Sequence, residues 1–492
     1  MAASTPPPAS GPGPTPSVAI PRSAARRLDV RVLDPAKAVR LDGDDALEPT
    51  LYAGNRLLVR GLATRSAQGP ISALAAIAER LGYSVEARRD ERFEALVEQN
   101  ELGDTVDTAV STMVEFRPLP HLPVVAPDAW LILQTLRAED PESARSVGLS
   151  HIVTAAGYGS GVGYGSGVGY GSGVGYGSGV GYGSGVADDE VAMPGGGPSP
   201  RVPVVWGAPA PVPSRKSGPV VALLDTGLGE HPWFADRVNG LLDPLAGHGT
   251  FIAGVVRQHC PDATLMVVPV MRGDGVTDEA FLVETLGLLY VRQLLTHSGR
   301  GTGPAIDVLS LSLGYYHETP GAFDDEPAFS SVLRALAGTG VAVVAAAGNG
   351  GTNHEFYPAA FATSGGFDVA VTSVGAHNPD GATVSVYSNT GSWVTAYRCG
   401  TAVVSTMPTT FDGSLRPVLA QPAGHDPARG SCDPDDYSSG FALWSGTSFA
   451  APAYAGAVAA ALVPLGIAED ADVATRVEAL RKAQATVGEG ER

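Results

Sequence analysis

Three side chains in separate motifs have the types needed for nucleophilic acyl transfer. Asp225 follows the apolar run Val220–Leu224, His248 stands in a Gly-His-Gly-Thr motif, and Ser448 stands in a Gly-Thr-Ser-Phe-Ala-Ala-Pro motif. A serine hydroxyl must lose its proton as it attacks a carbonyl carbon, an imidazole can take that proton, and a carboxylate can orient the imidazole. These residue types predict Ser448 as nucleophile, His248 as general base and Asp225 as the residue that orients the histidine.

The same chemistry needs hydrogen-bond donors for the oxyanion that forms during attack. Asn349 follows an apolar run that ends in Ala346-Ala347-Gly348, so its amide is expected just beyond a strand. Ser448 directly precedes the Ala-rich apolar stretch Phe449–Ala468, which we expect to form a helix. The amino-terminal end of a helix favours developing negative charge. The stretch is long enough to span a membrane, but its position favours a buried core helix.

The elements that would position these groups lie between residues 219 and 487. Short continuous apolar runs alternate there with helical patterns, which is typical of parallel strands covered on both faces. The fold class expected is therefore α/β with a doubly wound, mainly parallel sheet, whose carboxyl-terminal edge is the usual place for an active site. The expected strands are Val220–Leu224, Thr264–Pro269, Ile306–Leu311, Val341–Ala346 and Val369–Val374. Val473, Val477 and Leu480 predict a final amphipathic helix before a tail at 488–492.

Three further segments precede this domain. Residues 1–50 are Pro-rich and then charged without periodicity, which predicts disorder. Residues 51–156 read as β-α-β-β-α-β, the order of a small ferredoxin-like α+β domain. Residues 157–218 contain five perfect copies of Gly-Tyr-Gly-Ser-Gly-Val and then a Pro-rich stretch. We expect this segment to be a flexible linker, with an r.m.s. span of about 45 Å for Gly-rich statistics; an adhesive tyrosine-bearing tract is the alternative.

The four motifs around Asp225, His248, Asn349 and Ser448, in this order, resemble those of the subtilase (subtilisin-like) family of serine endopeptidases. The resemblance implies a Ser-His-Asp triad with a covalent acyl-enzyme. It also implies that the Asn349 side chain and the Ser448 backbone N–H form the oxyanion hole. Further residues carried over by the resemblance are Ser312, Leu313 and Gly314, as the strand that pairs with extended substrate, and Ala346, Ala347 and Gly348, as one wall of the pocket before the cleaved bond.

The residues at positions 248 and 349 and the second histidine near Asp225 bear on this assignment. The related sedolisin type has a glutamate and an aspartate where His248 and Asn349 stand, so activity near neutral pH is expected here. His231, in Glu-His-Pro close to Asp225, is the rival imidazole. The family shows a similar His-Pro there without a catalytic role, so we interpret His231 as structural.

Departures from the family concern metal and thiol sites. Residues 259–264 pass directly from the expected helix to the next strand, so the calcium loop that many subtilases insert there looks absent. No cofactor is expected for catalysis, and a structural calcium at another site stays open. Cys399 and Cys432 bracket much of the long Pro-, Gly- and Asp-rich insertion 401–437, and whether they pair is open.

A β-α-β-β-α-β unit ahead of a subtilase resembles the propeptide that assists folding and then blocks the cleft. If so, the unit is an intramolecular inhibitor, and residues near Leu149–Ala156 lie along Ser312–Gly314 like a product strand. Three alternatives stay open: acyl transfer to an amine by a ligase or macrocyclase, an inactive binding module, and a partner-sensing N-terminal unit.

The overall charge bears on partners. Lys plus Arg number 32 against 51 Asp plus Glu, a net charge of −19, so neither nucleic acid nor an anionic membrane is an expected partner, and polypeptide substrates are. Residues 1–30 lack the apolar core of a secretory signal, which favours a cytoplasmic location unless another export route operates.

Overall fold

The fold is described from a computed structural model. The structure describes residues 20–41, 47–88, 90–120, 125–156, 201–206, 208–215, 217–234, 238–240, 247–320, 328–410, 436–468 and 470–489. The glycine repeat, Cys432, most of the 401–437 insertion and the last three residues lie outside the described residues, so the predictions made for them stay predictions.

A seven-stranded parallel sheet forms the core of the C-terminal domain. All neighbouring strands in it run parallel, so the predicted doubly wound sheet is confirmed. Its order is β16 (Ala396–Cys399), β15 (Thr372–His377), β13 (Ala342–Ala346), β11 (Val308–Leu311), β7 (Val220–Asp225), β9 (Thr264–Pro269) and β8 (Val238–Gly240). The central strands read as continuous apolar runs because helices cover both faces.

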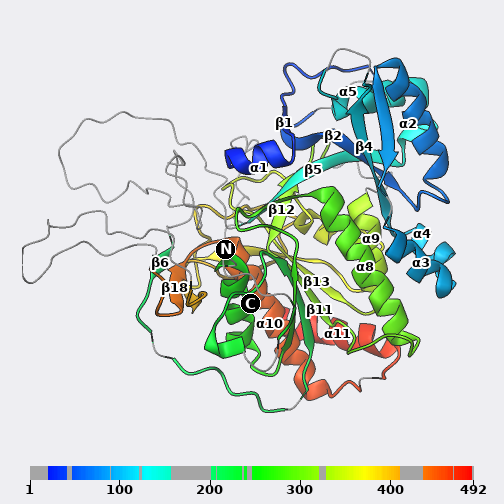
Figure 1. Ribbon diagram of the computed structural model, residues 1–492. Helices are drawn as coiled ribbons and strands as arrows, with labels where there is room; N and C mark the ends of the chain where they lie inside the picture. The colour runs from blue at the N-terminus through cyan, green and yellow to red at the C-terminus, as the bar shows by residue number, and fades with distance from the viewer. Residues whose placement is uncertain are drawn as a thin grey trace, which may run out of the picture.

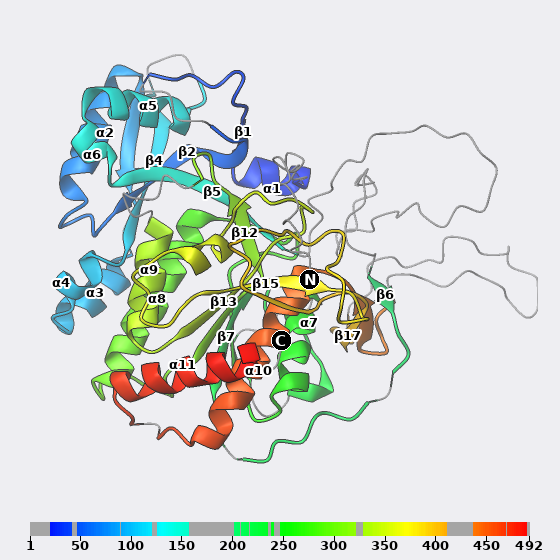
Figure 2. The same ribbon diagram turned by 180° about the vertical axis from the view of Figure 1, so that it is seen from behind.

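Helices lie on both sides of this sheet (Figures 1 and 2). On one side, α7 (Gly247–His259) and α10 (Thr447–Leu462) pack against each other, and α11 (Val473–Glu489) packs against α10. On the other side, α8 (Glu279–His297) packs against α9 (Ala328–Gly338). Among the described residues, the segment Thr447–Leu465 is the one helix long and apolar enough to cross a membrane. It is mostly buried between the sheet and its neighbours, as expected of a core helix.

The final helix is fixed to the sheet by a buried ion pair. Arg476 of α11 donates to Asp307 at 2.9 Å, and the other carboxylate oxygen of Asp307 accepts from the backbone N–H of Val220. Leu480 of the same helix is buried, on the face that the amphipathic pattern predicts. The pair therefore joins the last helix to the start of the strand that ends in Asp225.

The N-terminal unit follows the expected order of elements, with a short helix added before its last strand and two helices added between its second and third strands. Its elements are β2 (Thr50–Arg60), α2 (Gln68–Arg80), β3 (Tyr83–Ala87), β4 (Ser111–Pro118), α5 (Ala129–Glu139), α6 (Pro141–Ala144) and β5 (Val147–Ala155). Two helices that the pattern did not predict, α3 (Glu91–Gln99) and α4 (Gly103–Asp107), lie between β3 and β4. Asp90 caps α3 by accepting from the N–H groups of Arg92 and Phe93, a local signal that was present in the sequence.

The predicted disorder of residues 1–50 is wrong for part of this segment. Helix α1 (Arg22–Arg27) and strand β1 (Val30–Leu33) are formed, and β1 pairs antiparallel with β2. Arg27 also forms an ion pair with Asp274 of the C-terminal domain at 2.8 Å. These elements are stabilised by partners distant in the chain, which a local reading of composition does not reveal.

Strand β5 is shared by the two units (Figure 1). Its first part pairs with β2 of the N-terminal sheet. Its last part lies between two elements of the C-terminal domain, β10 (Val276–Asp278) and β12 (Leu313–Tyr316), and pairs antiparallel with both. The N-terminal unit therefore contributes a strand to the surface of the other domain.

The described ends of the linker and of the insertion also form structure. Strand β6 (Val202–Pro203), within the predicted linker, pairs with β18 (Phe441–Trp444), which pairs with β17 (Val403–Thr406) of the insertion. Arg201 donates to the hydroxyl of Tyr437 at 2.8 Å. The segment after the repeat is therefore attached to the C-terminal domain and does not act as free linker at residues 201–204.

Candidate active site

Asp225 and His248 form a buried pair at the carboxyl-terminal edge of the parallel sheet. Asp225 is the last residue of β7, and His248 is the second residue of α7. The Nδ1 atom of His248 lies 2.7 and 2.9 Å from the two carboxylate oxygens of Asp225. Because a carboxylate accepts hydrogen bonds, Nδ1 carries a proton in this pair, and in the neutral imidazole the opposite ring nitrogen, Nε2, has the free lone pair.

The sequence around this pair explains how the two elements approach so closely. A side chain at Gly249 would begin 2.1 Å from the carbonyl oxygen of Gly227, so glycine is required where α7 meets the turn after β7. The hydroxyl of Thr226 accepts from the N–H of Gly249, and Thr226 also donates its N–H to Asp225. The Asp-Thr-Gly and His-Gly-Thr motifs are therefore one packing unit.

The second nitrogen of His248 is buried and, among the described residues, has no hydrogen-bond partner. Aromatic rings fix the plane of the imidazole. Trp444 lies edge-on at 5.5 Å between ring centroids, and Phe449 lies at 5.7 Å. A buried imidazole nitrogen with a free lone pair and a fixed direction is suited to accept a proton.

Ser448 is the second residue of α10 and is completely buried. Its hydroxyl lies 3.4 Å from the carbonyl oxygen of Ser312, which is a long contact, and the Ser312 hydroxyl donates to the Ser448 carbonyl oxygen at 2.9 Å. The structure thus pairs Asp225 with His248 but shows no hydrogen bond from Ser448 to His248 among the described residues. Phe449, the next residue in the helix, contacts the imidazole, so the start of α10 lies beside His248.

Asn349 lies just beyond β13, and its amide is fixed from the α10 side. Its Oδ1 accepts from both the backbone N–H and the hydroxyl of Thr447, each at 2.9 Å. A backbone N–H can only donate, so these bonds identify Oδ1 and leave Nδ2 as the opposite atom. Nδ2 is buried and has no hydrogen-bond partner among the described residues. The Asn349 side chain therefore offers an unused N–H donor beside Thr447, the residue before Ser448.

Thr447 has a role in the site that the sequence did not predict. Besides donating to Asn349, its hydroxyl accepts from the N–H of Gly348 at 3.1 Å. It therefore joins the start of α10 to the loop after β13. The only signal in the sequence was its position in the Gly-Thr-Ser motif.

The predicted wall residues lie next to Asn349. Ala346 ends β13, and Ala347 and Gly348 follow it, all of them buried. Gly348 has φ +95°, and a side chain there would begin 2.6 Å from the Asn389 amide nitrogen. The turn that presents Asn349 therefore requires glycine at this position.

The predicted substrate strand is occupied by the end of β5. Leu313 pairs with Ala155 and Gly314 pairs with Thr154. The N–H of Ala156 donates to the Ser312 carbonyl oxygen at 2.9 Å. The predicted alignment of residues near Leu149–Ala156 along Ser312–Gly314 is therefore seen in the structure.

His231 lies in a different environment from His248. Its Nδ1 accepts from the N–H of Trp233 at 3.1 Å at the start of a short 3₁₀ helix (Pro232–Phe234). Burial lowers the pKa of His231 to about 4. This agrees with the structural role expected for it.

Residues 216–478 match the family model described as the subtilase family. Among solved structures, the chain is similar to the crystal structure of a cold adapted subtilisin-like serine proteinase, with 22% identity over 53% of this chain and 80% of that one and a TM-score of 0.36. A search of curated proteins found no match.

The family match covers more than half of the chain, and the chain belongs to the subtilase family. It is accordingly a serine-type endopeptidase that acts on polypeptides, with the subtilisin-like α/β fold described above.

Proposed function

We propose that Ser448 is the nucleophile of this endopeptidase, His248 its general base and Asp225 the residue that orients the histidine. The observation that carries the proposal is the buried Nε2 of His248, which has no partner among the described residues while Nδ1 is held by Asp225. A buried nitrogen without a hydrogen-bond partner is energetically unfavourable. In the proposed reaction, the Ser448 hydroxyl supplies the missing hydrogen bond to Nε2.

The proposed reaction begins when the Ser448 hydroxyl turns from the Ser312 carbonyl oxygen toward His248. The present contact of 3.4 Å is weak, so its loss costs little. As Oγ attacks the carbonyl carbon, its proton passes to Nε2, and Asp225 stabilises the imidazolium. The proton then goes to the leaving amine, and a water molecule activated by the same imidazole hydrolyses the acyl-enzyme.

Asn349 and the Ser448 backbone N–H are proposed as the donors to the oxyanion. The unpartnered Nδ2 of Asn349 supports this role, because a donor held ready in a water-poor site needs no reorganisation during attack. All groups required for this reaction belong to the chain itself, so the proposal includes no cofactor for catalysis.

A fluorophosphonate probe tests the assignment of the nucleophile directly. We expect the probe to modify Ser448 in active protein and expect neither labelling nor peptide cleavage in Ser448→Ala. Labelling of another serine, or full activity of Ser448→Ala, would refute the assignment.

We propose further that the N-terminal unit keeps the enzyme latent by holding β5 as a product-like strand. Support comes from the pairing of Thr154 and Ala155 with β12 and from the bond of Ala156 to Ser312, beside Ser448. By this register, Ala156 occupies the position just before the cleaved bond, so cleavage is expected between Ala156 and Gly157.

Latency can be tested by weakening the strand without touching the catalytic groups. Thr154→Pro removes the N–H of a residue paired with Gly314. The variant should cleave an added peptide from the first time point, whereas the parent protein should show a lag. Equal lags in both proteins would argue against inhibition by β5.

A further inference from the structure

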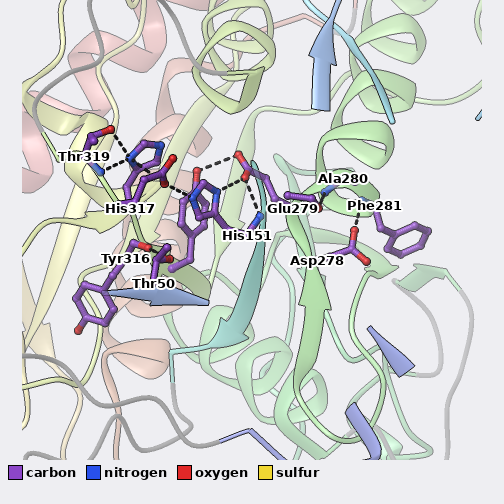
Figure 3. Close-up of polar contacts among 12 residues, drawn as sticks. Thr50, His151, Asp278, Glu279, Ala280, Phe281, Tyr316, His317 and Thr319 are labelled. Atoms are coloured by element: carbon purple, nitrogen blue, oxygen red, sulfur yellow. Dashed lines mark hydrogen bonds and ion pairs between the residues drawn. The ribbon is translucent and has the colours of Figure 1, made fainter. Parts of the chain in front are cut away.

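His151 of β5 lies between two buried carboxylates, one just beyond the β5–β10 ladder and one two residues after β12. Asp278 of β10 pairs with Ile152, and the next residues outward are Glu279 and His151. The two ring nitrogens of His151 lie 2.6 Å from a carboxylate oxygen of Glu279 and 2.7 Å from one of Glu318. Figure 3 shows the contact between His151 and Glu279. The backbone N–H of His151 also donates to Glu279. All three side chains are almost completely buried.

Two ionised carboxylates in this geometry require a cation between them. A neutral imidazole has one N–H and one lone pair, so it satisfies only one carboxylate, whereas an imidazolium donates to both. Burial lowers the pKa of His151, but Glu318 and Glu279 outweigh burial and raise this pKa to about 10. The His151 ring therefore sits in the site as a planar cation.

Tyr315 of β12 gives the site a flat wall. Its ring stacks on that of His151 with 4.4 Å between centroids and 10° between planes. Its hydroxyl donates to the second oxygen of Glu279 at 2.9 Å, which fixes that carboxylate. An aromatic face with two carboxylates at its edge suits planar cations, guanidinium above all, better than a compact ammonium.

A divalent metal fits these residues less well. His151, His317 and Glu318 offer ligand atoms within 4.8 Å of one another. However, the 2.7 Å between His151 and Glu318 is a hydrogen-bond distance, shorter than the roughly 3.3 Å that separates two ligands at about 2.0 Å from a tetrahedral zinc. The Nδ1 lone pair of His317 already accepts from the N–H of Thr319 at 3.0 Å.

We infer that Glu279, Glu318 and Tyr315 form a substrate subsite for a planar cationic side chain, arginine or protonated histidine. Counting back from Ala156 as the first residue before the cleaved bond, His151 is the sixth. An extended substrate that pairs with β10 and β12 as β5 does places its own sixth residue against the same carboxylates. The inference rests on the proposed function, because it uses the register of β5 as that of a substrate.

Peptides with the sequence of residues 149–158 test the subsite when histidine, arginine, lysine or glutamine stands at the His151 position. At pH 6, the protein after its own processing should cleave the arginine peptide with a kcat/KM about tenfold above that of the glutamine peptide, the size expected for charge-assisted hydrogen bonds. Histidine should follow arginine, and lysine should fall between histidine and glutamine. Equal rates for arginine and glutamine would overturn the inference while leaving the proposed peptidase function intact.

Protein variants locate the preference. Glu279→Gln and Glu318→Gln should each reduce the arginine-to-glutamine ratio toward one. Glu284→Gln is the matched control, because Glu284 lies on the same helix but is not among the residues that contact His151. It should keep the full ratio. An unchanged ratio in both Glu279→Gln and Glu318→Gln would place the preference elsewhere and refute the subsite.

A binding measurement tests the inference without any peptide cleavage. Absence of cleavage would refute the proposed function, whereas the binding measurement concerns the subsite alone. In full-length Ser448→Ala, hydrogen exchange of the amides of residues 152–155 reports how firmly β5 is held. Adding His151→Arg should keep their protection, and adding His151→Gln should reduce it at least tenfold. Equal protection in the two variants would overturn the inference, as would loss of protection in Ser448→Ala on treatment with EDTA, which would identify a metal site.

Discussion

Ala156 and Ser448 share one hydrogen-bond acceptor. The N–H of Ala156 donates to the carbonyl oxygen of Ser312 at 2.9 Å, and the hydroxyl of Ser448 lies 3.4 Å from the same oxygen. The two residues are almost 300 positions apart in the chain, so this contact depends on the docking of the N-terminal unit. It places Ala156 next to the proposed nucleophile.

The pairing of Asp225 with His248 gives a first prediction. In Asp225→Asn, the amide NH₂ can donate to Nδ1, which moves the ring proton to Nε2 and removes the base. We expect kcat to fall by about ten-thousand-fold with little change in KM. Steady-state cleavage of a peptide, with circular dichroism to verify folding, measures this. A loss of less than tenfold would show that His248 does not depend on Asp225.

Thr447 is predicted to position the proposed oxyanion donor. Thr447→Val keeps the shape of the side chain but loses the hydroxyl that links Asn349 to Gly348. We expect kcat to fall about tenfold, while KM stays nearly constant, because the amide of Asn349 is less well fixed.

The conservative variant Thr447→Ser retains the hydroxyl and serves as the control for this experiment. It should restore kcat to near the parent value. If both variants lost the same activity, the effect would come from packing and not from the hydrogen bonds.

Docking of β5 is predicted to depend on pH through His151. Its pKa is about 10 in the docked state, against about 6.5 for an exposed histidine. Because docking raises this pKa, the stabilisation of docked β5 is complete below about pH 6.5 and is lost as the pH rises toward 10. The equilibrium constant for docking falls by up to about tenfold per pH unit. Protection factors of residues 152–155 in Ser448→Ala, corrected for intrinsic exchange rates, should therefore fall from pH 6.5 to 9.

The other charged or titratable groups that face His151 are Glu279, Glu318, Tyr315 and His317. Burial lowers the pKa of His317 to about 4 and raises that of Tyr315, so neither changes charge between pH 6.5 and 9. Adding His151→Arg should remove the pH dependence over this range. A slope that survives this substitution would assign it to another group.

The ion pair between Arg476 and Asp307 gives a prediction about stability. Arg476→Leu leaves the buried Asp307 carboxylate without its cation, so the free energy of unfolding should fall by about 3–5 kcal/mol. The double variant with Asp307→Asn should recover part of this loss, because no uncompensated charge remains. Urea denaturation in the Ser448→Ala background measures both. Equal stability of the single and double variants would show that the charge is not the cause.

Much of the fold could be predicted because local patterns and tertiary structure agree. The five predicted strands of the parallel sheet are found within two residues of their predicted starts, except β15, which starts three residues later at Thr372. Buried parallel strands give continuous apolar runs, which are strong signals. Helix α10 could be distinguished from a membrane span because the motif around Ser448 precedes it directly.

The missed elements are those that depend on distant partners. Strand β1 is short and exposes Val32, and it exists because β2 pairs with it. The acidic site around His151 joins residues from β5, the start of α8 and the end of β12, and no spacing in the chain connects them. The present direction of the Ser448 hydroxyl is a further detail that motifs do not encode.

Cleavage after Ala156 requires β5 to lie as a product strand in front of Ser448. Intact mass measurement of the full-length protein during incubation tests this directly. Wild type should yield two fragments separated between Ala156 and Gly157, while Ser448→Ala should keep its full mass under the same conditions. Cleavage of Ser448→Ala at this bond, or a wild-type protein that cleaves added peptides yet never cuts after Ala156, would contradict the account.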